Sequence, residues 1–155
     1  MDYSAVMAFV LPKQSFLALA AIGWVDGSLQ RIEAEGLVRA AKEAGLGADD
    51  VGEIEKATKA KVGLEAIDVA GFGKWEQVLT YALGAWFAQV DGVVSTSEHE
   101  TLVELGNKLG LDDALRKRAS AAAYDVACLP EGGKPGKYDF QKLVARLKEK
   151  LPQLG

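Results

Sequence analysis

The chain has 155 residues, of which 49% are hydrophobic and 26% charged, with a formal net charge of −4 and one cysteine, Cys128. This length predicts a single domain over residues 1–155, and the hydrophobic fraction excludes an intrinsically disordered chain. A lone cysteine excludes an internal disulfide framework and is typical of a reducing compartment.

The apolar N-terminal segment does not have the form of a signal sequence or of a membrane span. Its first charged residue is Asp2 rather than a basic residue, and Pro12 and Lys13 interrupt the apolar run. The longest uninterrupted run, Phe16–Val25, has ten residues, which is about half of what crosses a bilayer. We therefore expect a cytoplasmic protein.

The rest of the chain is helical in pattern, because no segment alternates apolar and polar residues for long enough to predict a strand. In chain order, the predicted helices are Tyr3–Leu11, about 13–25, Gln30–Ala44, Asp49–Val62, the short Leu64–Ala70, about 75–90, Ser95–Leu109, Asp112–Leu129 and Tyr138–Leu151. Pro130–Lys137, rich in proline and glycine, is a predicted loop. The expected fold class is therefore all-α, a single bundle of about seven to nine helices.

Charge is unevenly distributed along the chain, with acidic residues predominating up to residue 112 and basic residues beyond it. We expect the basic C-terminal part to pack against the acidic body or to stay solvated. The alternative is a weak contact of this part with a membrane surface. No basic patch is interleaved with aromatic residues, so we expect no nucleic-acid partner.

An offset of 65 residues relates two segments of the chain. Val25–Leu46 reads VDGSLQRIEAEGLVRAAKEAGL and Val90–Leu111 reads VDGVVSTSEHETLVELGNKLGL, and nine of these 22 positions are identical. An apolar helix precedes each segment, so the first repeat covers about residues 13–46 and the second about residues 78–111. Two copies are too few for a solenoid, and we expect a pseudo-two-fold pair of helix–turn–helix units within one globule.

The 17 glycines of the chain exceed the usual ~7% of residues, and the repeat explains many of them. Four are predicted to end helices at matching places in the two repeats, where a left-handed residue is needed: Gly27, Gly45, Gly92 and Gly110. Four others lie inside predicted helices, where they favour close approach of neighbouring helices: Gly23, Gly36, Gly84 and Gly106.

Two shared glutamates differ in the direction that they are predicted to face. At about 100° per residue, Glu33 falls on the same side of its helix as the apolar Leu37, whereas Glu35 falls on the opposite side. Glu98 and Glu100 repeat this geometry in the second copy. Glu33 and Glu98 are therefore predicted to point inward, which is costly for a carboxylate without a partner.

Two explanations of the inward carboxylates remain open. Helix capping explains Glu98 well, because Ser95 and Glu98 form a capping box, but Gln30 is a weak cap in the first copy. The other explanation is a cation site made by four carboxylates: Asp26, Glu33, Asp91 and Glu98. Oxygen ligands alone favour Ca²⁺ or Mg²⁺ over zinc.

No catalytic motif is present in the sequence. His99 is the only histidine and is predicted to face solvent, which excludes a His-rich zinc site. Cys128 lies in an apolar helix pattern and is predicted to be a core thiol. Trp24, Trp75 and Trp86 are predicted to pack in the core, and we expect no cofactor-binding residues.

The repeated pattern of an apolar helix, V-D-G, a glutamate six residues after the glycine and a helix ending in G-L resembles the TerB-like family of tellurite-resistance proteins. Related domains occur in a membrane-anchored DnaJ-type co-chaperone. The resemblance implies a pseudo-symmetric all-α bundle without enzymatic activity, and it implies a cation-binding surface at the acidic positions that match Asp26, Glu33, Asp91 and Glu98. QRIE in the first copy departs from the usual small polar cap residue.

The predicted function is a non-enzymatic, TerB-like stress-response module that acts through contacts with other proteins. A divalent cation at the acidic positions stays open as the alternative to helix capping. Two alternatives stay open. The first is a metal-dependent enzyme that uses the carboxylate cluster, although di-metal bundles usually need several histidines. The second is a co-chaperone or adaptor domain at the inner membrane surface.

Overall fold

The computed structural model describes residues 12–25, 31–43, 45–89, 96–127 and 149 of the chain. Its elements are α2 (Lys13–Trp24), α3 (Arg31–Glu43), α4 (Ala48–Lys59), the 3₁₀-helix η1 (Leu64–Ala66), α5 (Lys74–Gln89), α6 (Thr96–Leu109) and α7 (Asp113–Ala127). No strand occurs in these ranges, so the all-α prediction is confirmed for the part of the chain described. The predicted helices Tyr3–Leu11 and Tyr138–Leu151, the loop Pro130–Lys137 and Cys128 lie outside it.

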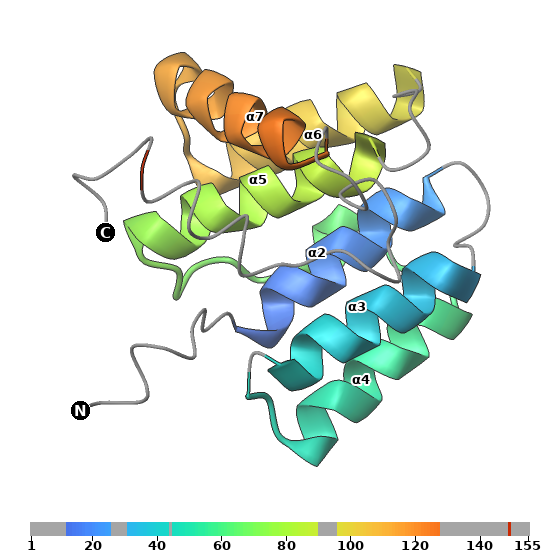
Figure 1. The fold of residues 1–155 in the computed structure, drawn as a ribbon. Coiled ribbons are helices and arrows are strands. Elements are labelled where there is room, and N and C mark those ends of the chain that lie inside the picture. The colour runs from blue at the N-terminus through green and yellow to red at the C-terminus, as the bar shows by residue number, and fades with distance from the viewer. Residues whose placement is uncertain (1–11, 26–30, 44, 90–95, 128–148, 150–155) are drawn as a thin grey trace.

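Helices α2 and α5 form the centre of the bundle, as their nearly uniform apolar composition predicts. Helix α2 packs against α3, α4, α5 and α6, and α5 packs against α6 and α7 as well. In Figure 1, α3 and α4 lie on one side of α2, while α6 and α7 lie beyond α5. The largest fully buried side chains include several from these two central helices: Phe16, Leu19, Ile22, Leu79, Leu83 and Trp86.

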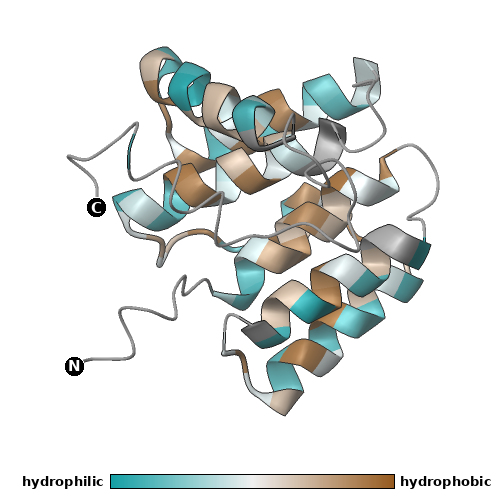
Figure 2. Ribbon diagram, viewed as in Figure 1, coloured by the Kyte–Doolittle hydropathy of each residue, from teal (hydrophilic) through white to brown (hydrophobic). Residues whose placement is uncertain are grey.

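The outer helices are amphipathic, and Figure 2 shows apolar and polar residues alternating along α3 and α4. The apolar stripe of α3 is buried at Leu37, Ala40 and Ala41, and the stripe of α6 is buried at Leu102 and Leu105. Burial of these stripes against α2 and α5 supplies most of the stability of helices of this length, because short helices are marginal in water. Within the described residues, none of the helices is both long enough and apolar enough to cross a membrane.

Helices α3 and α6 end in the same way, as the two matching glycines predict. Gly45 has φ +86° and Gly110 has φ +73°, both in the left-handed region. The N–H of Leu46 donates to the Ala41 carbonyl at 3.3 Å, and the N–H of Leu111 donates to the Gly106 carbonyl at 3.1 Å. This is the Schellman arrangement, which satisfies carbonyls that a helix end would otherwise leave without partners.

Gly84 allows α5 to lie close to two other helices. A Cβ atom at Gly84 would be 2.8 Å from Ile22 Cδ1 of α2 and 3.3 Å from Leu105 Cδ2 of α6. The prediction that helix-interior glycines serve close helix packing is therefore confirmed at Gly84. Gly106 likewise faces a side chain of a neighbouring helix, since a Cβ there would be 2.7 Å from the guanidinium carbon of Arg116 in α7.

A pair of buried hydroxyls joins α2 to α5. Ser15 Oγ and Thr80 Oγ1 are 2.7 Å apart, and both residues are completely buried. Their separation of 65 residues is the offset of the sequence repeat. Helices α3 and α6, which begin at Arg31 and Thr96, have the same offset. So do α4 and α7, which begin at Ala48 and Asp113.

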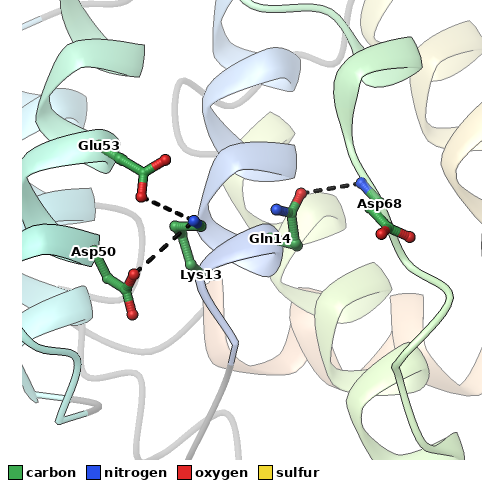
Figure 3. A network of polar contacts seen from close by, with 5 residues as sticks. All are labelled: Lys13, Gln14, Asp50, Glu53 and Asp68. Carbon is green, nitrogen blue, oxygen red and sulfur yellow. Dashed lines mark hydrogen bonds and ion pairs between the residues drawn. The ribbon is translucent and has the colours of Figure 1, made fainter.

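Polar contacts fix the start of α2 to two other segments (Figure 3). Lys13 Nζ donates to Glu53 Oε2 at 2.8 Å and lies 3.9 Å from Asp50 Oδ1, so it connects α2 to α4. The hydrogen bond to Glu53 raises the pKa of the Lys13 ammonium above its ordinary value. On the other side, the N–H of Asp68 donates to Gln14 Oε1 at 3.0 Å.

The segment after α4 is less helical than predicted. Helix α4 ends at Lys59, because Ala60 is extended, and the predicted helix Leu64–Ala70 is only the 3₁₀ turn Leu64–Ala66. Asp68 accounts for the shortening of the predicted helix Leu64–Ala70. Its side chain accepts a hydrogen bond from the N–H of Ala70, and its own N–H donates to the side chain of Gln14. Side chains of this type compete with helical hydrogen bonds.

The predicted core positions of the tryptophans are confirmed to different degrees. Trp86 is 1% exposed, and Trp75 is partly buried against the core. Trp24 is half-buried, and its Nε1–H donates to the carbonyl of Ala57 at 2.7 Å. Ala57 lies in the last turn of α4, where carbonyls lack helical partners, so the indole caps this helix end.

Candidate functional site

Of the four predicted cation ligands, Glu98 is the one whose side chain the structure describes. It is the third residue of α6 and is 8% exposed, as its inward direction predicts. Glu100 is exposed, and in the first repeat Glu35 is exposed as well. The predicted alternation of an inward and an outward glutamate is therefore confirmed in α6.

The other three predicted ligands cannot be placed against Glu98. Glu33 is the third residue of α3, the position that Glu98 has in α6, but its side chain is outside the described part of the structure. Asp26 and Asp91 lie outside it entirely. Among the side chains that are described, no group of three or more His, Cys, Asp or Glu residues could hold a metal ion. The shared cation site stays a prediction.

An acidic cavity of about 300 Å³ lies beside the first turns of α6. Its lining comes from the end of α2, the connection after α4 and one face of α6: Ala21, Val25, Lys61, Val62, Gly63, Leu64, Glu65, Ser97, Glu100, Thr101 and Glu104. None of the four predicted cation ligands is among the described lining residues, although Val25 and Ser97 are the sequence neighbours of Asp26 and Glu98. Three carboxylates and one lysine give the cavity a negative potential that favours cations.

A larger groove of about 570 Å³ runs between α3 and α4. We call it the α3–α4 groove, and its lining residues are Arg31, Ala34, Glu35, Val38, Arg39, Lys42, Glu55, Thr58 and Lys59. Four of these are cationic and two are acidic, so the groove is net positive in a chain whose formal net charge is −4. Arg31 Nε and Glu35 Oε2 form an ion pair at 3.1 Å along one side of it.

The sequence analysis predicted neither the cavity nor the groove, and the α3–α4 groove shows why. The α3 lining follows the helical spacing Arg31, Glu35, Val38, Arg39 and Lys42, opposite the buried stripe. That spacing marks an outer face of the helix. The groove itself exists only because α4 packs beside this face, and no local pattern specifies that neighbour. The signal in the sequence that could have indicated the groove is Val38, an apolar residue on the largely polar outer face of α3.

The exposure of the only histidine was also predicted from its position on the helix. His99 is exposed on α6, as its angular position indicated. Among the exposed large apolar side chains of the described residues are Val103, at 41%, and Tyr124, at 61%. Val103 belongs to α6 and Tyr124 to α7.

Comparison with known proteins adds no relationship, because no family model, curated protein or solved structure matches this chain. The resemblance to the TerB-like family rests on the repeated V-D-G and glutamate motif, and it stays a prediction.

Proposed function

We propose that this chain is a non-enzymatic, TerB-like module of the stress response that acts through contacts with other proteins. The observation that carries the proposal is the α3–α4 groove, whose walls are the outer faces of two helices. A helix or an extended segment of another protein fits such a surface, and helix-in-groove binding is a recurrent mode of recognition. The charged rim would select partners by electrostatic complementarity and raise the rate of association.

We also propose that the fold is a duplicated unit of three helices, α2–α4 and α5–α7, within the single domain 1–155. Three observations support it. Helices α4 and α7 begin 65 residues apart, α3 and α6 end in the same Schellman motif at Gly45 and Gly110, and Ser15 meets Thr80 in the core at that same offset. Equivalent residues touch where a two-fold axis passes between them, as in an isologous dimer interface.

The proposed role in stress is tested by growth on tellurite. Cells that lack this chain are expected to grow less well than the parent strain, and the wild-type chain should restore growth. Lys42→Glu with Lys59→Glu should fail to restore it, because both substitutions reverse charges on the rim of the α3–α4 groove. Lys117→Glu with Arg118→Glu, which makes the same charge change at exposed positions of α7, should restore it. Equal growth of all strains would contradict the proposal.

Cation binding is tested separately, by calorimetry and thermal melting of chelator-treated protein with Ca²⁺, Mg²⁺, Mn²⁺ and Zn²⁺. We expect Ca²⁺ or Mg²⁺ to bind at the predicted positions Asp26, Glu33, Asp91 and Glu98. A cation at a hundred times its dissociation constant would then add about 2.7 kcal/mol to the free energy of unfolding.

Glu33→Gln and Glu98→Gln should abolish the heat of cation binding, since each removes a carboxylate from the predicted set. Glu35→Gln is the matched control, because Glu35 is exposed and follows Glu33 by two residues. Absence of heat and of any change in Tm with all four ions would remove the cation from the proposal. The proposed contact with other proteins would be unaffected.

A further inference from the structure

The outer faces of α3 and α6 carry the same apolar residue in opposite electrostatic surroundings. At the 65-residue offset, Val38 of α3 corresponds to Val103 of α6. On α3, the residues one and four places after the valine are Arg39 and Lys42, whereas on α6 they are Glu104 and Asn107. The two faces therefore share the valine and a glutamate three residues before it, Glu35 and Glu100, but differ in charge on the C-terminal side of the valine.

On the outer face of α6, an exposed apolar side chain lies between two carboxylates. We call this face the α6 stripe and define it as Glu100, Val103, Glu104 and Asn107, which follow the spacing i, i+3, i+4 and i+7. All four residues are exposed, and Val103 has 41% of its surface open. The only basic residue of α6 is Lys108, in its last turn.

The α3–α4 groove has the complementary properties. Ala34 and Val38, both half-buried, supply apolar surface, and Lys42 and Lys59 are exposed cations on its rim. From Arg31 to Lys42 the α3 wall extends for about 17 Å at the usual helical rise. Helix α6, with 14 residues, is long enough to cover it.

We infer that the α6 stripe of one copy of this chain docks into the α3–α4 groove of a second copy. Val103 meets Ala34 and Val38, and Glu100 and Glu104 face the cationic rim. Because the two surfaces differ, the contact is head-to-tail, and a pair joined by one such contact keeps one free groove and one free stripe. This assembly goes beyond the proposed function, since it requires neither tellurite nor a cation.

Sedimentation velocity of the purified full chain tests the inference. The wild-type chain should form species larger than a monomer as its concentration rises, and more so at low salt, because screening shortens the reach of surface charges. The groove variant, Lys42→Glu with Lys59→Glu, and the stripe variant, Glu100→Lys with Glu104→Lys, should each weaken self-association at least about tenfold. Lys117→Glu with Arg118→Glu should associate like the wild type.

Mixing the two defective variants gives the sharper result. The groove variant retains an intact stripe and the stripe variant an intact groove, and the two reversed surfaces are again opposite in charge, so an equimolar mixture should regain the association that neither variant shows alone. All four substituted positions are exposed, and unchanged circular dichroism would show that the variants fold. A wild-type chain that stays monomeric, variants that associate like the wild type, or a mixture that stays monomeric would each overturn the inference.

Discussion

Replacing Ser15 by alanine is expected to lower the free energy of unfolding by about 1–3 kcal/mol. The Ser15 and Thr80 hydroxyls are 2.7 Å apart in a site without solvent exposure. Removing one hydroxyl leaves the other buried without this partner, and the cost is then the desolvation of a polar group rather than the small net value of a hydrogen bond. Urea denaturation followed by circular dichroism measures the loss.

The double variant Ser15→Ala with Thr80→Val separates this explanation from a simple loss of packing. With both hydroxyls removed, no polar group of the pair remains unsatisfied, and valine keeps the shape of threonine. We expect its stability to return to within about 1 kcal/mol of the wild type. If the losses of the two single variants add in the double variant, the two hydroxyls are not energetically coupled, and the explanation is wrong.

Gly84→Ala is expected to destabilise the protein by about 1–2 kcal/mol, although alanine is the better helix former. The new Cβ would be 2.8 Å from Ile22 Cδ1 and 3.3 Å from Leu105 Cδ2, and both of these residues are fully buried. Overpacking of this kind costs about 1–3 kcal/mol. The gain in helix propensity, about 1 kcal/mol, offsets only part of it. The same urea titration measures this variant.

Gly52→Ala is the matched control and should have the opposite sign. Gly52 lies inside α4, where a Cβ would meet no heavy atom within 4 Å, so alanine gains the helix propensity without a clash. An increase in stability of up to about 1 kcal/mol is expected. If both glycine variants change stability in the same direction, the close packing of α5 against α2 and α6 does not decide the effect at Gly84.

The parts of the fold that the sequence predicted correctly are those with local causes. Gly45 and Gly110 end α3 and α6 because a left-handed residue is needed at a position that only glycine occupies freely. Glu98 lies four residues before the buried Leu102 and so on the same face of the helix, and its burial could be predicted from this spacing. Neither deduction requires knowledge of which helices are neighbours.

Where neighbours matter, the sequence was less informative. The predicted helix Leu64–Ala70 is shortened because the N–H of Asp68 donates to the side chain of Gln14, 54 residues earlier in the chain. Gly106 was predicted to serve helix packing, but the sequence did not indicate that its neighbour is Arg116 of α7, whose side chain donates to the Leu111 carbonyl at 2.9 Å. The α3–α4 groove was missed for the same reason, because it depends on a helix brought alongside by the core.

The hydroxyl pair at the centre of the bundle has a consequence for how such a molecule can arise. A hydroxyl both donates and accepts a hydrogen bond, so Ser–Ser, Thr–Thr and Ser–Thr pairs are all satisfied, whereas two carboxylates or two ammonium groups would repel each other. A helix that meets its own copy across a two-fold axis therefore gains a polar contact without either partner having to change. In the proposed duplicated fold, Ser15 and Thr80 can therefore change between serine and threonine independently, while the other residues of the two units diverge.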